Sequence, residues 1–259
     1  MPIILSVIIV TYNSSYVITD SLNALMSSIQ TNISEIIIVD NASSDCTLDL
    51  LSEFKDLVKV ISLSSNIGFG GGVNEGIAIS RGEYILVINP DLIINRECLQ
   101  GMLDFIAGHE KVGVVGPKLL CLNGERQSSC RRYPILRAIL LNRITFLKSF
   151  LGESILVNYL MQDVAYSAPA EVEWIVGACM LFRRDALKEV GVFDNEFFLY
   201  FEDADWCYRA GKLRWKVVYM PMLAATHLYQ RKSTQGINKQ LGWHIMSLIR
   251  FYIKHGFRF

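Results

Sequence analysis

Residues 3–40 read IILSVIIVTYNSSYVITDSLNALMSSIQTNISEIIIVD, and the order of patterns in this stretch decides the fold. Ile3–Val10 and Glu35–Val39 are continuous apolar runs rich in β-branched residues, as is typical of strands buried on both faces. Between them, apolar residues recur at helical spacing over 17–29, and the polar residues 13–15 offer an N-cap. A strand, a helix and a second strand in this order predict a βαβ unit with parallel strands.

The same alternation extends through the first half of the chain. Val58–Leu63 and Tyr84–Ile88 have the composition of further strands, and Arg96–Ala107 has a helical pattern. We therefore expect an α/β fold in which helices flank both faces of a mostly parallel central sheet. Ligands of such sheets bind beyond the carboxyl ends of the strands.

The second half is less regular, and six elements are expected in it. They are a long basic helical stretch from Pro134 to Gln162, strands at Glu171–Ile175, Cys179–Phe182 and Trp215–Tyr219, and helices at Asp203–Ala210 and Ile237–His255. No internal repeat or low-complexity linker divides the sequence, so we expect a single domain over residues 1–259.

The composition describes a folded domain with an uneven distribution of charge. Apolar residues make up 51% of the chain and charged residues 19%, which argues against disorder. The formal net charge is zero, but Asp205 is the last acidic residue, and every charged side chain after it is basic. This asymmetry indicates an anionic partner: a phosphate, an acidic lipid surface or a nucleic acid. No nucleic-acid-binding motif is present, so we do not expect a nucleic acid.

The cysteines and the hydropathy pattern favour a reduced compartment. The six cysteines form no Cys-x-x-Cys pair, and most of them lie among apolar residues. The sequence has neither the pattern of a signal peptide nor an uncharged apolar run long enough for a membrane span. We therefore expect a cytoplasmic protein.

Three motifs place polar residues where this fold binds ligands. Asp40 ends a strand and can accept hydrogen bonds from a base or a ribose, although a turn or helix cap explains it equally well. Asn89-Pro90-Asp91 also follows a strand; Asp91 beside a diphosphate can hold a divalent cation, but the tripeptide is also ordinary turn chemistry. The segment Asn66–Gly76 contains five glycines, which we interpret as a ligand-facing helix start.

The strongest local signal is the run from Phe193 to Cys207, in which acidic and aromatic residues interleave. Acids among apolar groups are costly to bury, and burial raises a carboxyl pKa in the way that a general base requires. A helix N-terminus, whose dipole favours acidic residues, explains the same pattern. His227 follows an apolar strand, where a structural role is the commoner interpretation and a phosphate or metal role is the functional one.

In this order, the motifs resemble the family 2 glycosyltransferases of the GT-A fold, and most closely their bacterial rhamnosyltransferase-like branch. The matching pieces are Ser6–Asn13, Ile38–Ser43, Asn66–Gly70 with Asn74 and Gly76, Asn89–Asp91, Trp174–Ala178, Arg183–Arg184, Gly191–Asp194 and Phe198–Asp205. Each piece alone is weak, whereas the ordered set is specific and extends to about His227. Asn89 stands where the family's D-x-D motif usually has its first aspartate, a departure common in that branch.

The resemblance implies a role for each motif. Residues 1–117 would form a Rossmann-like nucleotide-sugar-binding half, and residues 118–259 an acceptor-binding half that holds the catalytic base. Asp203 would be that base, with Glu202 as its nearest rival, and Asp91 and His227 would bind Mg²⁺ or Mn²⁺. The implied substrate-binding residues are Thr11, Tyr12, Asn13, Asp40, Asn66, Gly68, Asn74, Asn89, Trp174, Gly177 and Ala178.

The resemblance further implies an inverting transfer in one displacement. The donor would be a nucleoside-diphosphate sugar, dTDP-L-rhamnose or alternatively a UDP-hexose. The acceptor would be a saccharide, expected to be lipid-linked, in the synthesis of bacterial cell-surface polysaccharide. A non-catalytic protein of this fold that binds sugar nucleotides or polysaccharide is the competing interpretation, which the presence of both Asp91 and Asp203 disfavours.

Two segments combine basic and apolar residues in an amphipathic pattern. Residues 131–151 carry Arg131, Arg132, Arg137, Arg143 and Lys148 without an acid, and residues 243–259 repeat the pattern. Such helices are typical of membrane surfaces, which would place the protein at the inner face of the cell membrane. Packing on the core or a homodimer interface explains them equally well.

Overall fold

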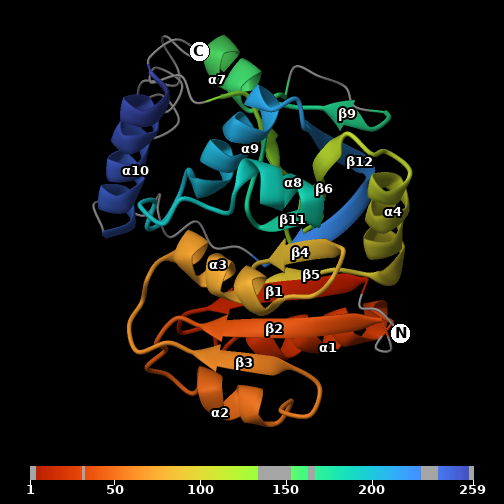
Figure 1. The fold of residues 1–259 in the computed structure, drawn as a ribbon, viewed down its shortest axis with the longest axis vertical. Helices are drawn as coiled ribbons and strands as arrows, with labels where there is room; N and C mark the ends of the chain where they lie inside the picture. Colours follow the sequence, from red (N-terminus) through yellow and green to blue (C-terminus); the bar gives the residue numbers. More distant parts are fainter. Residues whose placement is uncertain (1–3, 31–32, 134–152, 163–166, 229–238, 257–259) are drawn as a thin grey trace.

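The computed structural model describes residues 4–30, 33–133, 153–162, 167–228 and 239–256, and its centre is a mixed sheet (Figure 1). Its strand order is β3-β2-β1-β4-β11-β6-β12-β5. These strands are β1 (Leu5–Thr11), β2 (Ser34–Asp40), β3 (Lys59–Ser62), β4 (Tyr84–Ile88), β5 (Leu92–Ile93), β6 (Val112–Leu120), β11 (Cys179–Arg183) and β12 (Lys216–His227). Two short strands extend the sheet at its margins: β7 (Arg126–Gln127) beside β6, and β9 (Ala170–Glu171) beside β12. A separate two-stranded sheet joins β8 (Cys130–Arg131) to β10 (Trp174–Ile175).

The direction of the strands confirms the expected α/β architecture. β3, β2, β1 and β4 are parallel neighbours, and β12 is parallel to β6. β11 runs antiparallel between β4 and β6, and β5 runs antiparallel to β12. Six strands of the main path therefore share one direction. The predicted boundary between the two halves, after residue 117, falls inside β6, so one sheet runs through both halves.

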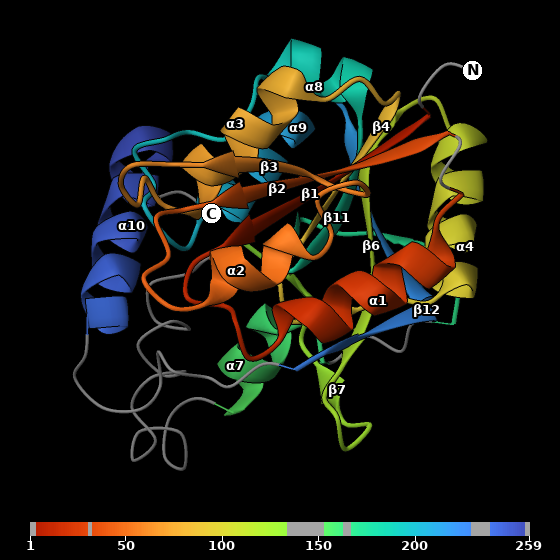
Figure 2. The same ribbon diagram turned by 90° about the horizontal axis from the view of Figure 1, so that it is seen from below.

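Helices cover both faces of the sheet, and each face has its own hydrophobic core (Figure 2). The helices are α1 (Ile18–Ser28), α2 (Thr47–Ser52), α3 (Phe69–Ile79), α4 (Arg96–Ala107), α7 (Glu153–Tyr159), α8 (Arg184–Val190), α9 (Glu202–Lys212) and α10 (Lys239–His255). Residues of α1, α2 and α4 pack with Val7 and Ile9 of β1, whereas α3, α8, α9 and α10 share the core that contains Ile8 and Val10. The alternation of buried residues along β1 is what lets one strand support both layers.

Several sequence expectations need correction. The strand expected at Val58–Leu63 is the edge strand β3, in which Val60 is 40% exposed, because it has a neighbour on one side only within the described sheet. The expected strand Glu171–Ile175 is split between β9 and β10, which belong to different sheets. α1 has Val17 as its N-cap residue, with no side-chain hydrogen bond, so the cap expected from residues 13–15 is absent.

Other expected elements differ in length or lie partly outside the described residues. β12 continues from the expected Trp215–Tyr219 segment to His227, and its register shifts between Met220 and Ala224, past Pro221. Such an irregularity lets a strand pass a proline, which cannot donate to the sheet. Of the long helix expected from Pro134, only its end is described, as α7, and residues 134–152 lie outside the described part.

The glycines at the start of α3 serve close packing between a helix and a strand. A Cβ atom at Gly72 would lie 2.8 Å from Val10, and one at Gly76 would lie 2.6 Å from Ile8, both in β1. Gly68 has a φ of 86°, and a Cβ there would meet the carbonyl oxygen of Phe198. The N–H of Phe69 already donates to that carbonyl (3.0 Å). Contacts with protein atoms therefore require the small size of these glycines, and a ligand-facing role of the helix start stays a prediction.

The remaining composition-based expectations concern cysteines and membrane spans. Cys98, Cys130, Cys179 and Cys207 are buried, as expected for cysteines that act as small core residues. Among the described residues, no helix is both long and apolar enough to cross a membrane.

Candidate active site

Asn89, Asp91 and His227 lie together where β4 and β12 end. Asn89 Nδ2 is 3.2 Å from Nε2 of His227, and Oδ1 of Asp91 is 3.2 Å from the same nitrogen. The pairing of β12 with β5 holds the segments in this register, since His227 lies opposite Leu92. Asp91 and His227, which are expected to bind a metal, are thus brought into direct contact by the antiparallel pairing of β5 with β12. The sequence does not reveal this pairing.

Gln127 of β7 fixes the orientation of the His227 ring. Its Nε2 donates to the carbonyl oxygen of His227 (3.0 Å), so its Oε1 is the atom that accepts, at 2.9 Å, from Nδ1 of the ring. With the proton on Nδ1, Nε2 is the ring nitrogen that faces Asp91. An imidazole nitrogen and a carboxylate oxygen this close together offer two ligands to a shared cation.

The pair fits a divalent cation only as a partial site. Within the described residues, no group of three or more His, Cys, Asp or Glu side chains converges on one point. Asp91 is half-buried and His227 is buried, so both side chains are held in place at the edge of the sheet. Mg²⁺ and Mn²⁺ sites of this kind are completed by phosphate oxygens of a substrate and by water.

Asp203 lies at the start of α9, and backbone donors hold its carboxylate. Gly177 N–H donates to Oδ2 (2.7 Å) and the N–H of Ala204 donates to Oδ1 (2.8 Å). Burial raises the pKa of Asp203, while these two N–H groups and the charge of Arg131 act in the opposite direction. Asp203 is therefore a buried acid whose ionised form is specifically stabilised.

The two neighbouring acids have different environments. Glu202 is buried, its Oε2 has no hydrogen-bond partner, and burial together with the charge of Asp203 raises its pKa well above the ordinary value. Asp205 is fully buried but forms ion pairs with Arg209 (2.8 Å) and Lys254 (2.7 Å). The carboxylate of Asp203 accepts a backbone hydrogen bond at each oxygen, whereas Oε2 of Glu202 accepts none.

Two consecutive residues connect Asp203 to the Asp91–His227 pair. Gly177 holds Asp203, and the carbonyl of Ala178 accepts from the backbone N–H of Asn89 (3.0 Å). A Cβ on Gly177 would lie 3.3 Å from Oδ2 of Asp203, which explains the glycine. Trp174, three residues earlier, is buried against Phe201, the residue before α9. The sequence-predicted segment 174–178 therefore spans both groups.

The expected nucleotide-binding residues of β1 and β2 form a second cluster at the ends of these strands. Thr11 lies opposite Asp40 and donates to its Oδ1 (3.0 Å). Ser43 donates to both oxygens of Asp40, through its N–H (2.9 Å) and its hydroxyl (2.5 Å). Asp40 is fully buried by these contacts, whereas Tyr12 is 51% exposed. Asn13 has a φ of 51° and accepts from the N–H of Ser44 (2.8 Å).

The loop before α3 joins this cluster to the segment that leads into α9. The side chain of Asn41 accepts a hydrogen bond from the N–H of Ile67 (2.9 Å) and donates one to the carbonyl of Gly68 (2.9 Å). The side chain of Asn66 accepts from the N–H of Gly68 (2.9 Å). Asn74 acts further along α3. Its amide exchanges two hydrogen bonds with the backbone of Phe193 and also contacts Asn195. These contacts position Asn74, and its role in substrate binding stays a prediction.

Sequence reasoning missed Gln127 and Arg131, which flank the site. No motif marks Gln127, and Arg131 was grouped with a basic amphipathic helix. Arg131 instead lies in β8, opposite Trp174 of β10. Arg132 is also outside any described helix, and its Nη1 donates to the carbonyl of Asn158 (2.6 Å).

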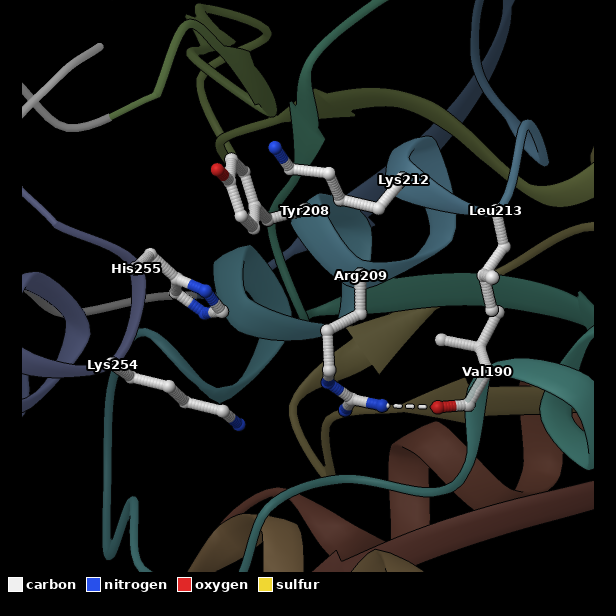
Figure 3. A pocket seen from close by; sticks show the side chains of 7 residues that line it. All are labelled: Val190, Tyr208, Arg209, Lys212, Leu213, Lys254 and His255. Carbon is white, nitrogen blue, oxygen red and sulfur yellow. Dashed lines mark hydrogen bonds between the residues drawn. The ribbon is translucent and has the colours of Figure 1, made fainter.

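A cavity of about 450 Å³ lies apart from these residues, where α9, α10 and the end of α8 meet (Figure 3). Its basic side chains are used by the protein itself. Arg209 donates to the carbonyl of Val190 (2.6 Å) and to Asp205, and Lys254 is paired with Asp194 (2.8 Å). We therefore assign this cavity to the contact between helices.

Comparison with known proteins identifies the family of the chain. The family described as "Glycosyl transferase family 2" matches residues 6–191. The N-acetylglucosaminyl-diphospho-decaprenol L-rhamnosyltransferase of Mycobacterium tuberculosis is 28% identical over 235 residues, which are 86% of this chain and 76% of that protein. Rhamnosyltransferase WbbL of Escherichia coli is 26% identical over 192 residues, or 71% of this chain and 70% of WbbL.

Solved structures show the same GT-A fold. Mannosyltransferase PcManGT from Pyrobaculum calidifontis, solved with GDP-Man and Mn²⁺, superimposes with a TM-score of 0.67 at 16% identity, covering 99% of this chain and 67% of that one. The chain spans 60% and 48% of two further solved proteins of this fold.

Proposed function

Since the chain belongs to glycosyl transferase family 2 and is a glycosyltransferase, we propose that it transfers L-rhamnose from dTDP-L-rhamnose to a lipid-linked saccharide, with inversion, in bacterial cell-surface polysaccharide synthesis. The observation that carries the proposal is the Gly177–Ala178 link, which joins a buried carboxylate to an Asp–His pair suited to a cation. The donor sugar rests on the similarity to rhamnosyltransferases, and a UDP-hexose is the alternative.

Asp203 is the general base of this proposal. It takes the proton of the acceptor hydroxyl, whose oxygen attacks the anomeric carbon while the nucleoside diphosphate leaves. The carboxylate must be ionised before it can act, which the N–H groups of Gly177 and Ala204 favour. Glu202 lacks comparable donors to its Oε2, and its pKa is raised well above the ordinary value, which makes it the weaker candidate.

Asp91 and His227 are the proposed protein ligands of Mg²⁺ or Mn²⁺. A bound divalent cation supplies positive charge for the leaving diphosphate. Gln127 holds the His227 ring so that Nε2 presents its lone pair, and Asn89 contacts the same atom. Because Mg²⁺ prefers oxygen ligands, the imidazole nitrogen favours Mn²⁺.

The nucleotide of the donor is proposed to lie over the ends of β1 and β2. Tyr12 offers an exposed aromatic ring there, and Asn13, Asn66 and Gly68 line the same loops. Asp40 is buried beneath them and bound to Thr11 and Ser43, so its contact with a base requires the Ser43 hydrogen bonds to open. Trp174, with Gly177 and Ala178, is proposed to border the sugar and the acceptor.

We further propose that the apolar face of α10 rests on an anionic membrane surface that carries the acceptor. Leu248, Phe251 and Tyr252 are buried against the protein, whereas the other side of the helix exposes Ile249 and Ile253. α10 contains no acidic residue, and every charged residue after Asp205 is basic. A helix with exposed apolar residues and a basic surround suits an anionic lipid surface.

One experiment tests the transfer reaction. The protein is incubated with a panel of nucleoside-diphosphate sugars, a lipid-linked N-acetylglucosamine acceptor, and Mn²⁺, Mg²⁺ or excess chelator, and product and released nucleoside diphosphate are measured. We expect transfer from dTDP-L-rhamnose with a cation and little transfer with chelator. If no donor released its nucleoside diphosphate, the proposed reaction would be rejected. If only a UDP-hexose supported transfer, the donor would be a UDP-hexose in place of dTDP-L-rhamnose.

Two variants assign the residues in the same assay. Asp203→Asn should lower the transfer rate by roughly a hundred- to ten-thousand-fold while donor affinity, measured by calorimetry, stays near wild type. Asp91→Asn should instead weaken Mn²⁺-dependent binding of the nucleoside diphosphate. Thermal melting of each variant checks that it is folded. An Asp203→Asn variant with the wild-type rate, beside a Glu202→Gln variant that has lost it, would transfer the base assignment to Glu202.

A further inference from the structure

Arg131 is held beside the proposed catalytic site by aromatic rings. It lies in β8 directly opposite Trp174 of β10, and its guanidinium carbon is 5.1 Å from the centre of the Trp174 ring. The ring of Tyr159 lies 5.8 Å from the same carbon. Stacking of this kind fixes the plane of a guanidinium without using its N–H groups.

Polar atoms in this region are buried without partners. Nε of Arg131 and the indole Nε1 of Trp174 are donors that find no acceptor among the described residues, and both are inaccessible to solvent. Buried donors without acceptors are costly and rare in folded proteins. The nearby carboxylate of Asp203 already accepts from Gly177 and Ala204, and its ionised form is also favoured by the indole of Trp174 and the charge of Arg131.

The missing acceptor is best supplied by a phosphate. A guanidinium and an indole N–H both donate only, and arginine is the side chain best matched to the oxygens of a phosphate. The Asp91–His227 pair is linked to the opposite end of the segment 174–178, through Ala178 and Asn89. Arg131 and Trp174 therefore form a second group of polar atoms, separate from the proposed cation ligands.

We propose that Arg131, together with the indole N–H of Trp174, forms a phosphate-binding subsite beside Asp203. This proposal deepens the proposed transferase function and rests on it for the source of the phosphate. Two substrates of that reaction carry one: the departing diphosphate of the donor, and the diphosphate of a lipid-linked acceptor. Both offer the same chemistry to the subsite.

The test compares Arg131→Met and Arg131→Lys with Arg132→Met, in which a neighbouring arginine that binds a backbone carbonyl is removed. Calorimetry measures the binding of inorganic pyrophosphate and of nucleoside diphosphate, and kinetics measure KM for the donor and for acceptors with and without a diphosphate. We expect Arg131→Met to lower the affinity for one of these phosphate ligands by roughly tenfold to a hundredfold, because charged hydrogen bonds to the phosphate are lost. Arg131→Lys should recover part of this loss, and Arg132→Met should match the wild type.

The outcomes separate the two sources. A higher donor KM and weaker nucleoside diphosphate binding assign the subsite to the leaving group. A higher KM restricted to the acceptor with a diphosphate assigns it to the acceptor. Unchanged pyrophosphate binding and unchanged KM values in Arg131→Met, or a loss of kcat alone with a shifted pH profile, would overturn the proposal. Pyrophosphate binding remains a valid test even if no donor is turned over, so failure of the proposed function is recognised separately.

Discussion

At the scale of single residues, Glu202 predicts a dependence of stability on pH. Burial and the charges of Asp203 and Asp205 raise its pKa well above the ordinary value of 4.5. The folded protein thus keeps a proton that the unfolded chain releases above about pH 4.5, and folding becomes less favourable as the pH rises from there to the raised pKa. Glu202→Gln cannot ionise, so it should be more stable than the wild type at pH 8 and similar to it near pH 4.

Each unit by which the pKa is raised corresponds to about 1.4 kcal/mol in this comparison. Urea denaturation at both pH values measures the free energy of unfolding, with Glu53→Gln as the control because Glu53 is exposed. If Glu202→Gln and the wild type were equally stable at pH 8, Glu202 would have to be ionised and stabilised in the folded protein.

The sequence predicts the position of a single residue well where that residue ends a strand or starts a helix, while its role stays a prediction. Asp40, Asp91 and Asp203 all occupy such positions, and their neighbours in the chain identify them. Gln127 escapes detection because its two-residue strand beside the end of β6 has no local pattern, and Arg131 because its partner strand β10 is distant in the sequence. The burial of Asp40 was equally hidden, since it depends on how Ser43 folds back over the carboxylate.

At the scale of elements, Asp205 predicts how α9 holds α10. It is fully buried and contacts Arg209 (2.8 Å) in its own helix, and Lys254 (2.7 Å) and His255 (2.7 Å) in α10. Asp205→Asn leaves these basic groups without their shared partner. Removing one member of a buried ion pair costs about 3–5 kcal/mol. We expect that loss in urea denaturation at pH 7, together with earlier proteolytic release of α10.

A matched removal of charge supplies the control for Asp205→Asn. Asp185 pairs with Lys188 at 2.9 Å on the surface, where such a pair contributes less than about 1 kcal/mol. Asp185→Asn should therefore change the free energy of unfolding little. Equal losses in the two variants would contradict a specific role for Asp205 in docking α10.

Prediction of helices and strands from the sequence succeeds in the first half of the chain, where the apolar patterns are regular. It fails for short strands that form only because a partner strand lies beside them. Strands β1, β2 and β4 lie almost where the apolar runs predict, because each is buried on both faces. The short strands β7 to β10 lack a recognisable period and exist through their partners. Periodicity fixes neither the partner of a two-residue strand nor the sheet to which it belongs.

At the scale of the whole molecule, one sheet connects the two proposed halves. β11 lies between β4 of the first half and β6, and β12 returns from the end of the chain to pair with β6 and β5. The donor-side loop at Gly68 also contacts Phe198, just before α9. The proposed donor and acceptor regions therefore share backbone contacts, so neither half is complete when separated from the other.

The same view of the molecule predicts where it meets a membrane. α10 lies at one side of the fold (Figure 1), and its outward residues Met246, Ile249 and Ile253 are 68%, 53% and 77% exposed. Burying two exposed isoleucine side chains in lipid stabilises binding by an amount of order 3 kcal/mol. The double variant Ile249→Gln/Ile253→Gln should thus bind anionic vesicles roughly a hundredfold more weakly than the wild type in a flotation assay at low salt.

The control is Leu122→Gln, because Leu122 is 76% exposed on a loop away from α10 and should leave vesicle binding unchanged. Neutral vesicles should bind the wild type less than anionic ones, since the residues after Asp205 add only positive charge. Sedimentation equilibrium distinguishes the alternative use of this face. One contrary result is a wild type that fails to bind anionic vesicles and forms a dimer instead, while the Ile249→Gln/Ile253→Gln variant is a monomer. That result would assign the exposed isoleucines to a contact with a second copy of the chain.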